Sequence, residues 1–174
     1  MTQMLSSIAL MLLSATSSLT VAPTQVVVER SQHPGDALRS RLGVVLPTAD
    51  TMIIIYGVAQ HHTRTEWSIV ASRSKDGKWT VERAGEEGPG LLRIDPHPLS
   101  ASKTALSSDT GRALDHLLID RQAYLEKVSG GDTPIGGYAS TMEIITPKRT
   151  RTIDWTGKLV GTLGQIVDTV ISPS

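Results

Sequence analysis

The sequence predicts an α+β fold in which an antiparallel sheet packs against two amphipathic helices. Residues 52–83 contain three runs with the apolar patterns of β-strands, separated by short polar or glycine-containing segments. Residues 139–155 contain a second pair of such runs. Two further segments, 107–129 and 159–171, space their apolar residues as one face of a helix does. We therefore expect a three-stranded meander plus a C-terminal hairpin, packed against the two helices.

The meander is expected to contain strands at residues 52–59, 66–73 and 78–83. The first strand is a continuous apolar run (MIIIYGVA), which indicates burial on both faces and a central place in the sheet. In the other two strands apolar and polar residues alternate, so Trp67 and Trp79 are predicted to face the core. Short connections between the runs favour antiparallel pairing.

A three-residue loop that ends at Gly77 is predicted between the last two strands of the meander. Such a loop pairs Ala71 with Val81 and Arg73 with Trp79, so that apolar residues meet across the strands. Gly77 then adopts the positive φ of a G1 bulge, a conformation without steric cost for glycine.

The C-terminal hairpin is predicted to have a four-residue loop at residues 147–150. A two-residue turn that begins with Pro147 is disfavoured, because proline cannot adopt the positive φ of a type I′ turn. The longer loop brings apolar residues together across the two strands. The predicted pairs are Ile144 with Ile153 and Met142 with Trp155.

The helices carry their own start and packing signals. Ser107 or Ser108 is expected to cap the first helix, and Asp120 is expected to divide it in two. In the second helix, Gly161 and Gly164 lower the helix propensity by roughly 1 kcal/mol each relative to alanine. We therefore expect these glycines to permit close packing.

Two segments are predicted to be irregular. Residues 33–36 (HPGD) carry a turn signal. Residues 84–102 are rich in Gly, Pro and charged side chains and are interpreted as a long surface connection. Residues 37–46 favour neither a helix nor a strand, since arginine and leucine alternate there without a clear period.

Residues 1–22 are interpreted as a signal peptide with its processing region, and residues 23–174 as a single domain. Glu29 is the first charged side chain, and the short apolar core at 8–13 precedes small residues that a signal peptidase accepts. This core is too short for a membrane span of about 20 residues. We expect cleavage near Ser17 and export to the periplasm or the medium. The alternatives are an uncleaved anchor and a buried helix of a cytoplasmic protein, since no Lys or Arg precedes the core.

The composition excludes several classes of function. The chain has no cysteine, which excludes disulfides and thiolate metal sites. Lys+Arg and Asp+Glu number 17 each, so the excess positive charge that binding to a nucleic-acid backbone requires is lacking. Three Trp, three Tyr and no Phe leave few rings for stacking on bases. We therefore expect no nucleic-acid partner.

The most reactive cluster in the sequence is His61-His62 followed by Glu66. Histidine binds metals and acts as a base near neutral pH. The spacing, however, matches no zinc motif such as HExxH. The polar stretch 60–65 is interpreted as the connection between the first two strands, so we expect both imidazoles to be at least partly solvated.

A second pair of candidates for acid–base chemistry is Asp115 with His116 on the first predicted helix. Neighbours on a helix lie about 100° apart and form no dyad by themselves. An enzyme using His61 or His62 would need these distant residues to converge in one cleft. We expect no catalytic, metal or cofactor site, and keep these residues as the candidates of the enzyme hypothesis.

The favoured function is that of a non-catalytic exported module that binds a protein or a component of the cell envelope. Lys148, Arg149 and Arg151 form the one basic cluster of the sequence, which suits contact with anionic lipid or cell-wall phosphates. The alternative for this cluster is charge that only keeps a hairpin tip soluble. Contact with a membrane is otherwise expected only through the signal peptide. The alternative functions are a small periplasmic hydrolase or metal-dependent enzyme, and a small-molecule carrier with a pocket between sheet and helices.

Overall fold

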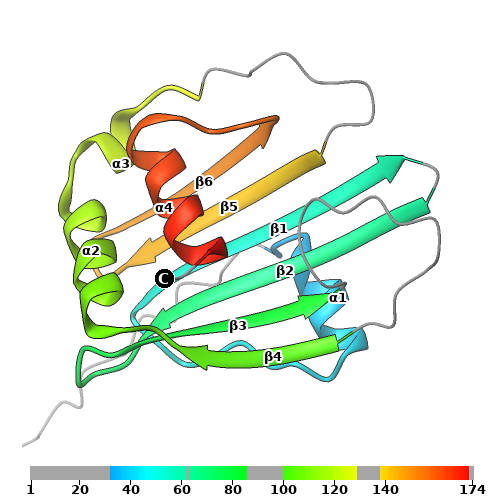
Figure 1. Ribbon diagram of the computed structural model, residues 1–174, viewed down its shortest axis with the longest axis horizontal. Helices are drawn as coiled ribbons and strands as arrows, with labels where there is room; N and C mark the ends of the chain where they lie inside the picture. Colours follow the sequence, from blue (N-terminus) through cyan, green and yellow to red (C-terminus); the bar gives the residue numbers. More distant parts are fainter. Residues whose placement is uncertain (1–31, 62, 86–99, 129–137, 173–174) are drawn as a thin grey trace, which may run out of the picture. The chain divides into compact units, whose positions relative to one another are not determined.

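The computed structural model describes residues 32–61, 63–85, 100–128 and 138–172. These residues form a six-stranded antiparallel sheet with the strand order β4-β3-β2-β1-β5-β6 (Figure 1). The α+β class is confirmed, whereas the predicted signal peptide lies outside the described residues. The strands are β1 (Thr51–His61), β2 (Thr63–Arg73), β3 (Trp79–Gly85), β4 (Ser100–Ala105), β5 (Tyr138–Thr146) and β6 (Arg149–Thr156).

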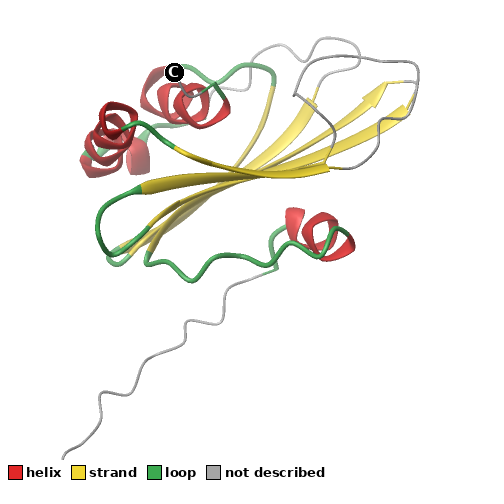
Figure 2. Ribbon diagram, turned by 60° about the horizontal axis from the view of Figure 1, so that its bottom comes forward, coloured by secondary structure: helices red, strands yellow, loops and turns green. Residues whose placement is uncertain are grey.

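Helices lie on both faces of this sheet (Figure 2). Helices α2, α3 and α4 cover one face, and α1 lies on the opposite face. The two predicted helices are confirmed, and the first is divided at Asp120 as expected. Ser107 caps α2, because its hydroxyl accepts a hydrogen bond from the Thr110 N–H at 3.1 Å. The helices are α1 (Gly35–Arg41), α2 (Ser108–Ile119), α3 (Gln122–Leu125) and α4 (Gly161–Ile171).

The predicted turn at residues 33–36 is present, because the Asp36 N–H donates a hydrogen bond to the His33 carbonyl (2.9 Å), but it continues into α1 instead of an irregular segment. The His33 N–H donates a hydrogen bond to Asp36 Oδ2 (2.8 Å), and the Gly35 N–H donates to His33 Nδ1 (3.2 Å). Both bonds satisfy backbone donors at the point where a helix leaves them without intrahelical partners. The same polar residues that favour a turn therefore cap a helix here.

The β2–β3 hairpin has the predicted register. Ala71 pairs with Val81, and Arg73 pairs with Trp79. Gly77 has a φ of 85°, as the predicted three-residue loop requires. Both the length of the loop and the bulge are therefore confirmed.

Charged side chains stabilise the conformation of this loop. The Ser74 hydroxyl donates a hydrogen bond to the Asp76 carboxylate and Lys78 lies beside it, which lowers the pKa of Asp76 from 3.8 to about 2. In return, Asp76 raises the pKa of Lys78. The contribution of Asp76 is present above its ordinary pKa and is lost as the pH falls toward 2. All three side chains are exposed, so water and salt screen these contacts.

The β5–β6 hairpin is confirmed, but its predicted register is wrong. The turn has two residues, Pro147 and Lys148, and the pairing is shifted by two residues from the predicted one. The Thr146 hydroxyl closes the turn, because it accepts a hydrogen bond from the Arg149 N–H (3.1 Å) and donates one to the Arg149 carbonyl (3.0 Å). The observed pairs include Met142 with Ile153, Ile144 with Arg151 and Ser140 with Trp155.

Two predicted connections, at residues 60–65 and 84–102, are shorter than expected. β1 and β2 extend into the polar stretch 60–65, where His61 pairs with Thr63. Backbone hydrogen bonds continue the ladder there although the side chains give no apolar signal. Similarly, β4 begins within the segment 84–102, and all six of its side chains are exposed. A strand without a buried face has no alternating pattern to detect.

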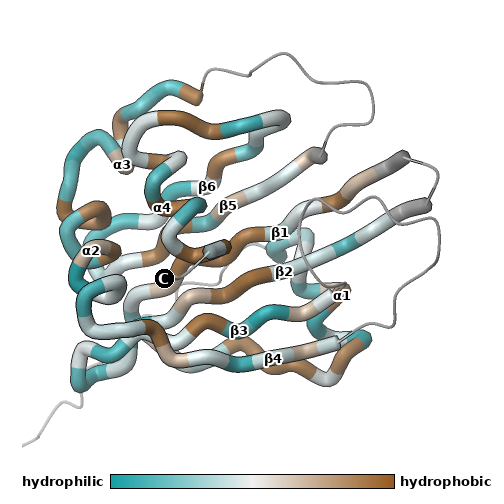
Figure 3. Tube along the Cα trace, viewed as in Figure 1, coloured by the Kyte–Doolittle hydropathy of each residue, from teal (hydrophilic) through white to brown (hydrophobic). Residues whose placement is uncertain are grey.

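The main hydrophobic core lies between the sheet and helices α2, α3 and α4, where the central strands are strongly hydrophobic (Figure 3). Trp67 and Trp79 face this core as predicted, with exposures of 5% and 2%. Gly161 and Gly164 are closely packed as expected, since an added Cβ would lie 1.9 Å and 2.6 Å from the nearest neighbouring atoms. Other buried members of the core are Ile53, Ile55, Ile69, Val81, Leu114, Met142, Ile144, Leu163, Ile166 and Val170.

The opposite face of the sheet is apolar at its centre and is covered by α1. Ile54 and Val70 are 0% and 2% exposed on this face, and Leu38 of α1 is 0% exposed. α1 contacts β1, β2 and β3. Among the described helices, none combines the length and the apolarity that crossing a bilayer requires.

Candidate functional site

The histidine pair of the sequence lies at the turn between β1 and β2. His61 is the last residue of β1, and His62 lies outside the described residues. The prediction about the solvation of both imidazoles concerns side chains outside the described part of the chain and stays a prediction. Glu66 in β2 accepts a hydrogen bond from the Arg41 guanidinium at 2.7 Å, which links β2 to the end of α1.

Asp115 and His116 lie at the other end of the sheet. Asp115 Oδ1 accepts a hydrogen bond from Trp79 Nε1 (3.1 Å) and pairs with Arg73 Nε (2.9 Å), while His116 is exposed. Arg73 pairs with Thr51 at the start of β1, whereas His61 ends this strand. Ten strand residues correspond to about 33 Å. The structure therefore does not bring Asp115 and His61 together.

No group of three or more His, Cys, Asp or Glu residues is arranged to hold a metal ion, as far as the described residues go. The candidates of the enzyme hypothesis are distributed over separate places. Glu66 is engaged by α1, and Asp115 is engaged by β2 and β3. Each of these carboxylates thus has a local structural contact.

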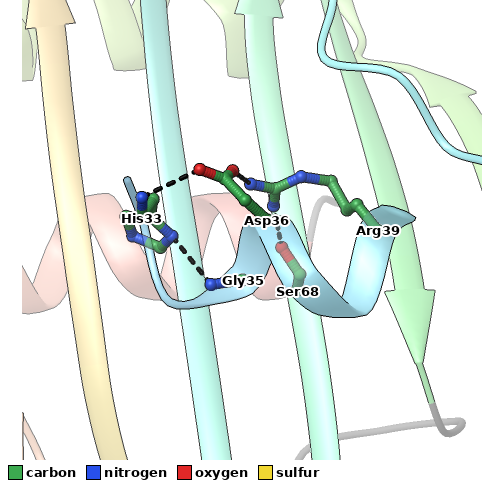
Figure 4. Close-up of polar contacts among 5 residues, drawn as sticks. All are labelled: His33, Gly35, Asp36, Arg39 and Ser68. Atoms are coloured by element: carbon green, nitrogen blue, oxygen red, sulfur yellow. Dashed lines mark hydrogen bonds and ion pairs between the residues drawn. The ribbon is translucent and has the colours of Figure 1, made fainter. Parts of the chain in front are cut away.

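A buried polar cluster fastens α1 to the sheet (Figure 4). The Arg39 guanidinium, whose side chain is 3% exposed, pairs with Asp36 one turn earlier and donates a hydrogen bond to the Ser68 hydroxyl of β2. Ser68 is 1% exposed and His33 is 4% exposed. Asp36 is the more exposed member of the ion pair, at 27%. The cluster therefore acts as a clasp between helix and sheet.

A groove lies between the β5–β6 turn and the helices α2 and α3. Its volume is about 500 Å³, and it opens at the end of the sheet where β1 begins and β2 ends. Arg73, Asp115, Lys148 and Arg149 supply its charged groups, and apolar walls come from α2, α3 and the turn. This volume falls within the range of about 300–1,000 Å³ that is typical of sites for small ligands.

Two cations at this groove are not neutralised. Neither Lys148 nor Arg149 forms an ion pair with a carboxylate in the described part of the chain, and both side chains are exposed. The Arg149 guanidinium lies over the Tyr124 ring, 5.0 Å from its centroid, which is a cation–π arrangement. The groove is thus positively charged in a chain whose net charge is zero.

The basic cluster of the sequence is divided by the structure. Arg151 donates hydrogen bonds to the carbonyl groups of Ala123 and Glu126, so it holds the end of α3 against β6. Lys148 and Arg149 remain available at the groove. Two of the three predicted cations therefore stay candidates for contact with an anion, and the third has a structural role.

Asp115 provides the groove with a fixed acceptor. Its hydrogen bond and its ion pair both use Oδ1, and Oδ2 makes no hydrogen bond to the described residues. The side chain is 31% exposed. Because Trp79 and Arg73 hold the carboxylate, its position in the groove is fixed.

Apolar residues complete the walls of the groove. Leu118 is 8% exposed, and Ile119, at 78%, is one of four large apolar side chains that are exposed among the described residues. The groove residues that sequence reasoning did not assign to a site are Thr51, Arg73, Leu118, Ile119, Tyr124, Thr146 and Pro147. These residues meet because α2 and α3 pack at the end of the sheet.

No protein-family model matches this chain, and a search of curated proteins finds no significant match.

Proposed function

We propose that this chain is a non-catalytic, exported binding module whose groove between α2, α3 and the β5–β6 turn holds an acidic group of a protein or envelope partner. The observation that carries this proposal is the pair of cations, Lys148 and Arg149, that line the groove without an acidic partner among the described residues. An anion that enters the groove supplies this partner.

The energetics favour an anion in this position. A hydrogen bond to a charged group contributes about 1.5–3 kcal/mol, roughly twice the contribution of a neutral one. Arg149 is already held on the ring of Tyr124, so it loses less side-chain freedom when an anion binds. The exposed Ile119 beside the cations adds apolar area that a ligand can cover.

Removal of the two free cations is expected to weaken the binding of simple acids. Inorganic phosphate and acetate serve as minimal probes in an NMR titration of the full chain. We expect both probes to shift the backbone amides at residues 148 and 149 and the indole N–H of Trp79, which bonds to Asp115. In a Lys148→Gln, Arg149→Gln variant the affinity should fall by about tenfold or more, as expected from the loss of one or more charge-assisted hydrogen bonds.

The matched control is a Lys75→Gln, Lys158→Gln variant, which loses the same charge from exposed sites that do not line the groove. It should bind both probes as the unchanged chain does. Equal losses in both double variants would show a general effect of net charge and would overturn the proposal. The same conclusion follows if neither probe shifts the groove resonances.

Export predicts a shortened chain in the native host. The uncharged N-terminal segment with its short apolar core supports this part of the proposal. Mass spectrometry of the protein from the native host should find a terminus between residues 16 and 25. An intact Met1 in a cytosolic fraction would refute export and leave the groove proposal standing.

A further inference from the structure

We infer that the acid bound in this groove carries hydroxyl groups, as a sugar acid does. This inference rests on the proposed function and adds the chemical class of the ligand. The observation behind it is that Asp115 lines the same groove as the free cations Lys148 and Arg149. A site with both kinds of group suits a ligand that is an anion at one point and a hydrogen-bond donor at another.

Asp115 discriminates against simple acids. An ionised carboxylate accepts hydrogen bonds and donates none, so Oδ2 of Asp115 repels the acidic group of a ligand. A ligand without donors also removes water from this oxygen without replacing the lost hydrogen bonds, which is unfavourable. A hydroxyl group next to the acidic group donates to Oδ2 and removes both penalties.

The acceptor is fixed before the ligand arrives. Trp79 Nε1 and Arg73 Nε hold Asp115 through Oδ1 at 3.1 Å and 2.9 Å. Trp79 is 2% exposed and belongs to the core. The position of Oδ2 is therefore determined by the packing of β3 against α2. A preorganised acceptor of this kind loses little conformational entropy on binding.

The remaining walls suit the body of a sugar ring. The volume of about 500 Å³ exceeds what an isolated carboxylate or phosphate group fills. Leu118, Ile119 and Tyr124 provide an apolar surface against which the C–H groups of a ring pack. A purely apolar acid also covers this surface, but it leaves Oδ2 without a donor. Asp115 therefore selects between these two kinds of acid.

The test compares three molecules that share one ring size. Galacturonate carries the acid and the hydroxyl groups, cyclohexanecarboxylate carries only the acid, and galactose carries only the hydroxyl groups. In NMR titrations of the full chain, we expect galacturonate to bind about tenfold or more tightly than cyclohexanecarboxylate, the difference of one hydrogen bond to a charged group. Galactose should not bind measurably, since the cations gain nothing from it.

An Asp115→Asn variant tests the role of the carboxylate directly. The amide keeps the size of the side chain and an oxygen for Trp79, but it presents a donor in place of Oδ2. The affinity for galacturonate should fall to that for cyclohexanecarboxylate, while the affinity for cyclohexanecarboxylate should not fall. Dispersion of the Trp79 indole resonance reports whether the variant is folded. If the variant does not fold, the inference is tested only by comparing the affinities of the three molecules for the unchanged chain.

Two further comparisons separate the outcomes. If tri-galacturonate binds about tenfold or more tightly than galacturonate, the source of the sugar acid is a polymer. If the two affinities are equal, the source is a free acid. Both outcomes support the inference. Cyclohexanecarboxylate that binds as tightly as galacturonate would overturn the inference and leave the proposed function intact. Failure of both acids to bind would overturn the proposed function itself.

Discussion

Replacing Gly57 with alanine is expected to lower the free energy of unfolding by about 3 kcal/mol. Gly57 lies in the middle of β1 and pairs with Trp67 of β2. An added Cβ would lie 2.2 Å from both Cε2 and Cζ2 of the indole, and Trp67 is only 5% exposed. The indole is rigid and largely buried, so the strands or the ring must shift. Thermal unfolding should show a decrease in Tm of roughly 6–12 °C.

A double-mutant cycle with Trp67→Leu assigns this cost to its cause. Leucine is smaller than the indole, so the added methyl group at Gly57 then finds room. In the Trp67→Leu background we expect Gly57→Ala to cost less than about 1 kcal/mol, and the two changes to be clearly non-additive. An equal cost in both backgrounds would show that the indole is not what Gly57 accommodates.

The local signals of the sequence were sufficient for the centre of the sheet. A long apolar run identifies a central strand, and β1 is flanked by β2 and β5. The turn at Gly77 determines the β2–β3 register, because only one loop length combines a glycine at the positive-φ position with apolar cross-strand pairs. Both inferences depend on residues that are close in the sequence.

The register of the β5–β6 hairpin shows where such reasoning fails. The predicted and observed registers differ by two residues, so both keep Met142, Ile144, Ile153 and Trp155 on the same face. The hydrophobic pattern therefore does not distinguish them. The choice depends on the Thr146 hydroxyl, which bonds to both backbone groups of Arg149 and stabilises a turn that proline alone disfavours.

The elements that were missed lack a pattern of their own. β4 is exposed on both faces and has no apolar alternation. α1 has only seven residues and derives its stability from contact with the sheet. For such elements tertiary packing decides the conformation, and intrinsic propensity carries little information.

Most charged residues of the groove could be recognised as candidates in the sequence. The sequence did not show that the fold places them in one groove. Lys148, Arg149 and Asp115 were recognised as separate candidates. The packing of α2 and α3 at the end of the sheet brings them together with Arg73 and Tyr124. The basic cluster of Lys148, Arg149 and Arg151 was the one signal in the sequence that pointed to contact with an anion. Which surface they line depends on the fold.

The docking of α1 on the second face predicts a large effect at Leu38. Leu38→Ala is expected to lower the free energy of unfolding by about 2–5 kcal/mol, the range for truncating a buried leucine. Leu38 is 0% exposed, and the strands beneath its helix carry the buried Ile54 and Val70. Urea unfolding measured by Trp fluorescence gives this free energy directly, since the indoles lie in the core on the other face.

Ser40 provides the matched control on the same helix. Its side chain is exposed, so Ser40→Ala should change the free energy of unfolding by no more than about 0.5 kcal/mol. The contrast between the two variants depends on burial alone, because both create an alanine within one short helix. If Leu38→Ala were as mild as Ser40→Ala, α1 would not be packed on the sheet in solution. A helix of seven residues is not stable without tertiary contacts. That result would therefore also show that the polar clasp of Asp36, Arg39 and Ser68 does not hold the helix in place.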